Sequence, residues 1–395
     1  MQDRPKHILP LIVLSQFAGT SLWFVGNAVL PELKQALHLS QYAVSGITSA
    51  VMLGFIAGTL VFAIFALADR FSPVRLFFIS SLFGALFNSA VAWWATDATT
   101  LYLLRFLTGF CLAGIYPVGM KIAADWYDKG LGKALGYLLG ALMLGTAFPH
   151  LLKNREFELP WQSVLHCTSI FALVGGFIIL FFVGDGPFRK RSGKFQWNAL
   201  VTIFSSKKWR QSAFGYFGHM WELYSVWGFT PLILGLYQEK NSASLNIPLM
   251  SFAVIAMGCL SSIIGGYLSQ KWGSAKIAFT ALLISGCCCL FSPFLFSLPV
   301  VFFITYLLLW GFTVSPDSPQ FSTLVAQYAP EHLRGTALTI YNSIGFAITV
   351  ISLQVIDRIF HSGSSIGGTN TFVWLTIGPL LGLLSFYKLA KQKNS

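Results

Sequence analysis

A short polar loop between two long apolar stretches reads LADRFSPVR at residues 67–75. After another long apolar stretch, 201 residues further along the chain, a similar loop reads LSQKWGSAK at residues 268–276. A sequence that repeats its loops at such a distance is typical of a chain built from two similar halves.

Two further landmarks repeat at almost the same distance. Gly109 and Pro117 match Gly311 and Pro319 at an offset of 202 residues. The tetrapeptide GKAL at 132–135 matches GTAL at 335–338 at an offset of 203 residues. Parallel repeats of six helices joined by a basic loop are the layout of one large class of membrane transporters.

The stretches around these loops are apolar enough to cross a membrane. Of the 395 residues, 55% are hydrophobic and only 10% are charged, whereas a soluble domain is about 25% charged. One spanning helix needs about 20 apolar residues. We therefore predict an all-α integral membrane protein with twelve transmembrane helices, at residues 8–31, 41–68, 74–96, 99–124, 133–152, 161–184, 212–237, 247–270, 275–297, 299–326, 335–357 and 371–390.

A basic segment divides the predicted helices into two groups of six. We expect residues 1–184 to form the first half, 185–211 a cytoplasmic linker and 212–395 the second half. The linker has one acidic residue, Asp185. Its basic residues are Arg189, Lys190, Arg191, Lys194, Lys207, Lys208 and Arg210.

The basic residues also predict the orientation in the membrane. With the N-terminus inside, 20 of the 26 lysines and arginines fall on the cytoplasmic side and five on the other. This asymmetry sets membrane topology. We expect both termini in the cytoplasm and a multi-pass protein of the inner (plasma) membrane, so the net charge of +12 does not indicate nucleic-acid binding.

The sequence gives no indication of an enzyme. It has no HExxH and no P-loop motif, and thus no sign of zinc hydrolysis or ATP binding. No CxxC pair occurs, so we interpret the cysteines as small buried side chains. We expect no cofactor and no metal.

The motifs in the loops and spans can be matched to a family. Leu67, Ala68, Asp69 and Arg70, with Arg75 downstream, resemble the signature loop of the major facilitator superfamily. Arg105 followed by Gly109 resembles that family's second motif, and residues 330–335 (PEHLRG) look like its loop before helix eleven. Span five partly resembles the glycine-rich antiporter signature, through Gly136, Gly140, Gly145 and Pro149.

This resemblance covers essentially the whole chain and implies a secondary transporter. It implies two pseudo-symmetric bundles that work by alternating access, with helices one, four, seven and ten around a central cavity. Gate roles follow for Asp69, Arg70 and Arg75, with Asp69 near the start of helix eleven. Helix five would contribute its glycines and Pro149 to gating.

Glu222 is the first candidate for proton coupling. It lies about ten residues into span seven, roughly 15 Å deep, where a carboxylate is costly and usually functional. His219 and Tyr216 lie on the same helix face, so His219 and Glu222 can share a proton. We also expect Glu222 and Tyr216 to contact the substrate. The alternative is a structural polar pair.

Asp317 lies between Pro316 and Pro319 in span ten. Two prolines three residues apart must bend or open the helix, which predicts a hinge. Asp317 is then a second titrating or cation-facing carboxylate, or alternatively part of a salt bridge or a helix cap.

Arg105 lies within span four and keeps its charge at all physiological pH values. It can hold a substrate anion or favour deprotonation of a nearby carboxyl group. The resemblance ties it to proton coupling. The alternative is a pair with a polar group of helix one, such as Asn27.

Polar and aromatic residues form a stripe on span one: Gln16, Thr20, Trp23 and Asn27. We interpret the stripe as a wall of the substrate cavity, and hydrogen bonding between helices is the alternative. Tyr341 and Asn342 on span eleven are further candidates for substrate binding.

We therefore expect a monomeric, proton-coupled transporter of a small organic solute, with efflux by antiport favoured over uptake. Its partners would be the solute, protons and membrane lipid. Proton-coupled uptake, facilitated diffusion of an organic anion and a non-transporting receptor or scaffold are the alternatives.

Overall fold

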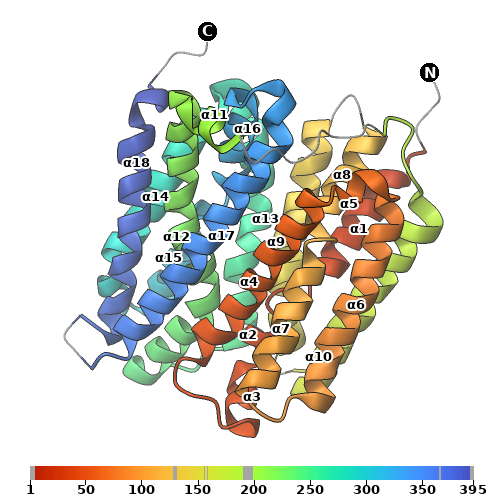
Figure 1. Ribbon diagram of the computed structural model, residues 1–395. Coiled ribbons are helices and arrows are strands. Elements are labelled where there is room, and N and C mark those ends of the chain that lie inside the picture. Colours follow the sequence, from red (N-terminus) through yellow and green to blue (C-terminus); the bar gives the residue numbers. More distant parts are fainter. Residues whose placement is uncertain are drawn as a thin grey trace. The chain divides into compact units, whose positions relative to one another are not determined.

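The computed structural model describes residues 5–127, 131–154, 156–157, 159–189, 199–363 and 366–391. Within this part of the chain every regular element is a helix (Figure 1). The helices separate into two compact units, one formed by residues 1–40 and 50–195 and the other by residues 41–49 and 196–395.

The first unit begins with a span that is broken into short pieces and continues with longer helices. Its elements are α1 (Ile8–Thr20), α2 (Val25–Ala28), α3 (Leu30–Ala36), most of α4 (Ala43–Ile64), α5 (Leu67–Arg70), α6 (Pro73–Trp94), α7 (Ala98–Leu112), α8 (Tyr116–Trp126), α9 (Leu131–Leu152), α10 (Trp161–Ile178) and the π-helix η1 (Ile179–Val183).

The second unit is built around the long helix α12. Its elements are α11 (Ala199–Ser205), α12 (Lys207–Asn241), α13 (Ile247–Trp272), α14 (Ser274–Leu295), α15 (Val300–Thr313), α16 (Ser318–Tyr328), η2 (Glu331–Leu333), α17 (Arg334–Phe360), η3 (Gly368–Thr376) and α18 (Ile377–Ala390). The first turns of α4 belong to it as well: Asp357 Oδ2 accepts the Ser45 N–H at 3.1 Å, and Gln354 donates to Ser49 Oγ at 3.0 Å.

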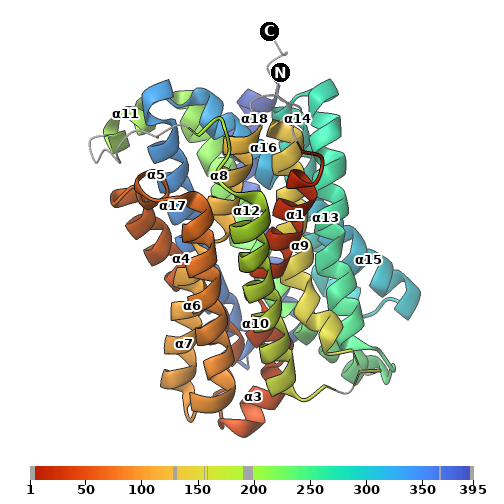
Figure 2. The same ribbon diagram turned by 90° about the vertical axis from the view of Figure 1, so that its right-hand side faces the viewer.

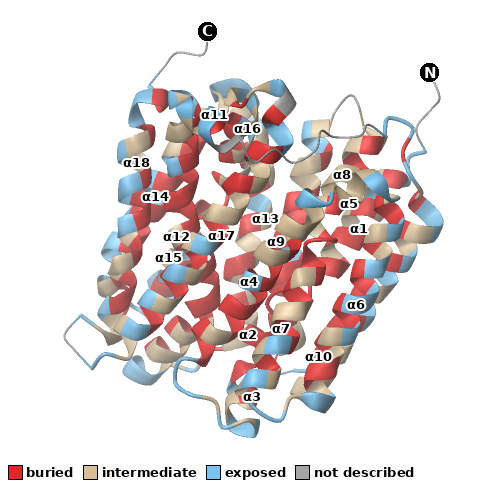
Figure 3. Ribbon diagram, viewed as in Figure 1, coloured by how far each residue is buried: buried red, intermediate tan, exposed pale blue. Residues whose placement is uncertain are grey.

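Ten helical segments of the described chain are long and apolar enough to cross a membrane. The broken first span and α12, which carries buried polar side chains, complete the predicted twelve. The prediction of an all-α, twelve-helix membrane protein is confirmed. Exposed residues occur along the length of the helices (Figure 3). Large apolar side chains such as Phe181 and Phe182 are among the exposed ones, as a lipid-facing surface requires.

Three spans are interrupted. The prolines around Asp317 open span ten between Thr313 and Ser318, as the sequence predicts. Span four is interrupted between Leu112 and Tyr116, just before Pro117, whose missing N–H removes a helical hydrogen bond. The first predicted span, residues 8–31, is also divided, because α1 ends at Thr20 and turns lead to α2.

The internal repeat reappears in the packing of paired helices. A Cβ atom at Gly109 on α7 would overlap the carbonyl group of Val51 on α4. A Cβ atom at Gly311 on α15 would overlap the carbonyl group of Val254 on α13. These two glycines match in the sequence repeat, and each lets two helix backbones approach closely. Figure 2 shows α6 and α7 running side by side, as Figure 1 does.

Only part of the basic linker can be described. Residues 190–198, with Lys190, Arg191 and Lys194, lie outside the described residues, as do Arg155 and the side chain of His332. Lys207, Lys208 and Arg210 belong to the first turn of α12, which starts earlier than the predicted residue 212.

Outside the spans, Asp97 fixes the start of α7. Its Oδ1 accepts the Thr100 N–H at 2.9 Å, as an N-cap does. This backbone hydrogen bond holds the pKa of the Asp97 carboxyl group below its ordinary value.

Candidate functional site

Glu222 is completely buried on α12 and is held by two neighbouring helices. Trp310 on α15 donates its indole N–H to Glu222 Oε1 at 2.8 Å. Ser285 on α14 donates to Oε2 at 2.9 Å. Each oxygen therefore has a donor, in an arrangement that can hold a carboxylate or share a proton.

His219 and Asp317 form a second buried pair in the same unit. His219 Nδ1 lies 2.9 Å from Asp317 Oδ1, and neither side chain is exposed to solvent. Asp317 stands at the start of α16, in the break of span ten, but its side chain does not cap that helix. This contact takes the place of the pairing of His219 with Glu222 that the sequence suggested, because the break before α16 brings the Asp317 carboxyl group next to the imidazole.

Tyr216 extends this cluster to α17. Its hydroxyl group donates to Asn342 Oδ1 at 3.1 Å, and its ring stacks on Tyr341 at 3.8 Å between centroids. The rings of Tyr216 and His219 also stack, at 5.7 Å between centroids. The structure thus brings together five candidates that the sequence placed on three different spans: Tyr216, His219, Asp317, Tyr341 and Asn342.

Arg105 in the first unit holds the broken span rather than a carboxylate. Its Nη2 donates to the carbonyl oxygens of Leu22 and Trp23, each at 2.8 Å. Its Nη1 donates to Asn88 Oδ1 at 2.7 Å. The side chain is completely buried, and no ion pair joins it to a carboxylate within the described residues. Asn88, on α6, replaces the suggested partner Asn27.

The stripe on the first span is buried inside the first unit. Gln16, Thr20, Trp23 and Asn27 are all at most 4% exposed. Thr20 donates to the Gln16 carbonyl oxygen at 2.8 Å, and Trp23 packs on Phe55 at 4.9 Å. The Gln16 amide group differs from the others, because neither its nitrogen nor its oxygen has a hydrogen-bond partner in the described structure.

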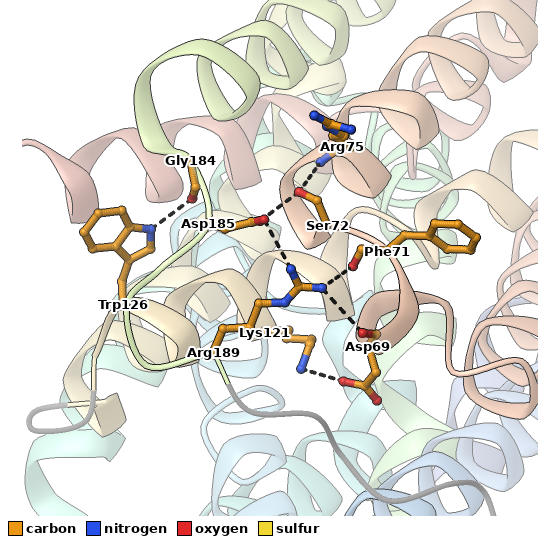
Figure 4. Close-up of polar contacts among 9 residues, drawn as sticks. All are labelled: Asp69, Phe71, Ser72, Arg75, Lys121, Trp126, Gly184, Asp185 and Arg189. Atoms are coloured by element: carbon orange, nitrogen blue, oxygen red, sulfur yellow. Dashed lines mark hydrogen bonds and ion pairs between the residues drawn. The ribbon is translucent and has the colours of Figure 1, made fainter.

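The loop after α4 is a network of charges within the first unit (Figure 4). Asp69 pairs with Lys121 of α8 at 2.8 Å, and Arg189 donates to the carbonyl oxygens of Asp69 and Phe71. Ser72 donates to Asp185 at 2.8 Å and accepts the Arg75 N–H at 3.3 Å. Ser72 and Pro73, which depart from the family signature, therefore cap and start α6. Arg70 is exposed.

The glycines of span five serve different purposes. A Cβ atom at Gly145 would overlap Thr20 Oγ1 and the carbonyl oxygen of Phe17, so this glycine lets α9 lie against α1. A Cβ atom at Gly136 would meet nothing within 4 Å. Gly140 and Pro149 are buried in α9. Close helix packing therefore explains Gly145 but not Gly136.

The two prolines of span ten have separate positions at the break. Pro319 lies in the first turn of α16, where its missing N–H is tolerated. Pro316 lies against α13, because a Cβ atom at Gly265 would be 2.9 Å from Pro316 Cβ. The break next to Asp317 is thus packed against a neighbouring helix.

The family model of the Major Facilitator Superfamily matches residues 12–353. The chain belongs to the major facilitator superfamily. It is therefore a multi-pass membrane transporter and not an enzyme.

Relatives within this superfamily differ in what they carry. An uncharacterised MFS-type transporter of Bacillus subtilis, YceJ, is 23% identical over 88% of each chain. A nitrite extrusion protein of the same organism is 26% identical over 73% of this chain and 72% of its own. The crystal structure of a D-xylose–proton symporter superposes with a TM-score of 0.78 at 13% identity, covering 98% of each chain, and establishes the shared fold.

Sequence reasoning missed several residues that hold the candidate site of this superfamily member. Trp310 was not among the candidates from the sequence, yet it is completely buried and hydrogen-bonds to Glu222. Ser285 and Asn88 are small polar residues within apolar spans. Their polarity was the only feature of the sequence that could have pointed to them. Which of them faces Glu222 or Arg105 depends on helix packing between distant segments.

Proposed function

We propose that this chain is a proton-coupled secondary transporter that exports a small amphipathic organic solute. The observation that carries the proposal is the group of titratable side chains in the second unit: Glu222, His219 and Asp317, all without solvent exposure. A charged side chain at the centre of a membrane costs at least about 2.5 kcal/mol. A protein that keeps two carboxylates there gains a place to bind and release protons.

The hydrogen bonds of Glu222 are suited to a change of protonation. Trp310 and Ser285 stabilise the carboxylate, while the Ser285 hydroxyl can rotate and accept a hydrogen bond from the O–H of a protonated Glu222. We assign the contacting side chains of His219 and Asp317 as a second site that passes protons to or from Glu222. Arg105, which cannot titrate and already binds three oxygens, would then serve proton coupling only through the shape of the first unit.

Substrate contact is assigned to the polar and aromatic candidates of both units. The Gln16 amide is buried with both polar atoms unpaired, and leaving such a group unsatisfied costs about 1–3 kcal/mol. A solute with hydrogen-bonding groups would remove this cost. Aromatic side chains at Trp23, Tyr216 and Tyr341 favour a solute that also has an apolar or ring-bearing part.

Export is favoured over uptake by the glycines of span five that resemble the antiporter signature. The two functionally named relatives reported above point in different directions, since one is an extrusion protein and the other a symporter. We further propose a monomer in the inner membrane with cytoplasmic termini, from the distribution of basic residues, and two halves at residues 1–184 and 212–395.

Transport by purified protein in proteoliposomes with an imposed pH gradient tests the proposal. We expect Glu222→Gln to lose gradient-driven accumulation while solute exchange between the two sides continues, because glutamine keeps a carbonyl acceptor for Trp310 but cannot titrate. Glu239→Gln, a change of an exposed residue on the same helix, is the matched control and should behave as the unaltered protein. A Glu222→Gln variant that still concentrates solute would refute proton coupling through this residue and favour facilitated diffusion.

The solute can be sought with a thermal-shift screen of organic anions, cations and neutral metabolites. Gln16→Ala should abolish the shift that a genuine solute produces, and Thr305→Ala, a change of an exposed residue on α15, should not. Equal shifts in both variants would remove Gln16 from the solute site. Loss of accumulated solute from cells that produce the protein supports export, and a gain supports uptake.

A further inference from the structure

A cavity on the second unit lies apart from the Glu222 hydrogen bonds and is used by none of the roles above. Its volume is about 350 Å³, within the range of small-molecule sites. It lies between α13, α14 and the broken span ten, and its walls include Ile264, Ile277 and Phe312. Its lining is therefore mainly aliphatic and aromatic.

The cavity opens toward the apolar outer surface of the chain. Ile264 and Ile284, two of its lining residues, are 44% and 39% exposed. In a chain that spans the membrane, such exposed apolar side chains face lipid chains rather than water. An occupant with an apolar part can thus enter from the bilayer.

One end of the cavity carries a positive charge and an interfacial aromatic residue. Lys276, near the start of α14, is the single charged residue of the lining, and no ion pair involves it among the described residues. Trp272, at the last turn of α13, lines the same end and is 49% exposed. Tryptophan at this position is typical of a side chain at the level of lipid headgroups.

We propose that this cavity binds an anionic phospholipid, with its phosphate at Lys276 and one acyl chain between α13 and α14. The charge decides between occupants, because an apolar groove that ends in an unpaired lysine complements a lipid with a negative headgroup. By the distribution of basic residues this end faces the cytoplasm, where anionic lipids attract basic side chains near membrane helices.

The position of the cavity gives the lipid a structural consequence. Pro316 and Thr313, which flank the break of span ten, line the cavity, and Gly265 packs against Pro316. An acyl chain in the cavity would therefore contact the backbone break beside Asp317. This contact couples lipid occupancy to the break without requiring the proton role proposed for Asp317.

Native mass spectrometry tests whether the site prefers an anionic headgroup. The full chain is compared with bound phosphatidylglycerol and with bound phosphatidylcholine of the same acyl chains. We expect preferential retention of phosphatidylglycerol, reduced about fivefold in Lys276→Ala. The matched control is Lys271→Ala, which removes an equally basic, exposed residue on the neighbouring turn that does not line the cavity. Equal losses in both variants would mean diffuse attraction to the surface and would overturn the proposal, as would equal retention of the two lipids.

Quenching of tryptophan fluorescence by brominated acyl chains tests the place of the chain. Brominated phosphatidylglycerol should quench the part of the fluorescence that comes from Trp272, and this quenching should be absent in Trp272→Phe. It should be weaker in Thr280→Phe, which fills the cavity without changing its charge. An unchanged Trp272 component in Thr280→Phe would place the lipid elsewhere. Since both variants alter exposed residues, their folding should remain intact and can be checked by their melting temperatures.

Discussion

Each unit buries charged side chains, but the two do so with different chemistry. In the first unit Arg105 is permanently charged, and its partners are carbonyl oxygens of a broken helix and the amide of Asn88. In the second unit the partners are side chains: Glu222 accepts hydrogen bonds from Ser285 of α14 and Trp310 of α15. His219 lies against Asp317 at the break of span ten. The difference shows that a fixed charge satisfies the backbone of a broken helix in one unit, whereas the buried polar groups of the other are held by side chains of neighbouring helices.

Arg105→Met should give the largest loss of stability. It would leave the carbonyl groups of Leu22 and Trp23 and the Asn88 amide oxygen buried without a donor, at a cost of about 3–5 kcal/mol. Thermal unfolding in detergent measures this loss. Arg358→Met, at an exposed arginine, serves as the control and should change little. Equal melting temperatures for the two variants would mean that water or another group satisfies the broken span.

Gly145→Ala separates packing of the first span from its charge interactions. The added methyl group would overlap Thr20 and the Phe17 carbonyl oxygen, so the helices must separate at a cost of about 1–3 kcal/mol. Gly136→Ala in the same helix has open space and should be neutral or slightly stabilising. The same unfolding assay compares them, and no difference between the two alanines would contradict the close approach of α9 to α1.

A double-mutant cycle on His219→Gln and Asp317→Asn measures the ion pair in the second unit. We expect a coupling energy of about 1 kcal/mol, because the two side chains are in direct contact. The pair His219→Gln and Glu239→Gln, which lie 20 residues and hence about 30 Å apart on α12, should be additive within about 0.5 kcal/mol. Additivity in the first cycle would mean that the two buried groups do not interact in the folded protein.

The sequence predicted features that depend on local chemistry. The prolines flanking Asp317 predicted the break in span ten, and the apolar lengths predicted the spans. Matched glycines at 109 and 311 predicted the repeat, which the structure explains by the same close approach of helices in each unit.

What the sequence could not predict depends on contacts between distant segments. The break after Thr20 has no proline within it, and its stabilising partner is 82 to 83 residues away. The spacing of His219 and Glu222 correctly placed them on one helix. It could not show that Asp317 would contact His219 or that Trp310 would donate to Glu222. Those contacts depend on how α15 and the break before α16 pack against α12.

The bond between Arg105 and the first span has a consequence for the biogenesis of the protein. The first span leaves the ribosome about 80 residues before Arg105, and alone in lipid its break would expose unsatisfied carbonyl groups. A fourth span inserted alone would carry an uncompensated arginine, at about 2.5–3.5 kcal/mol on the scale of translocon insertion. Neither segment is well suited to lipid until the other arrives. Both are therefore expected to wait beside the insertion machinery and to enter the bilayer together.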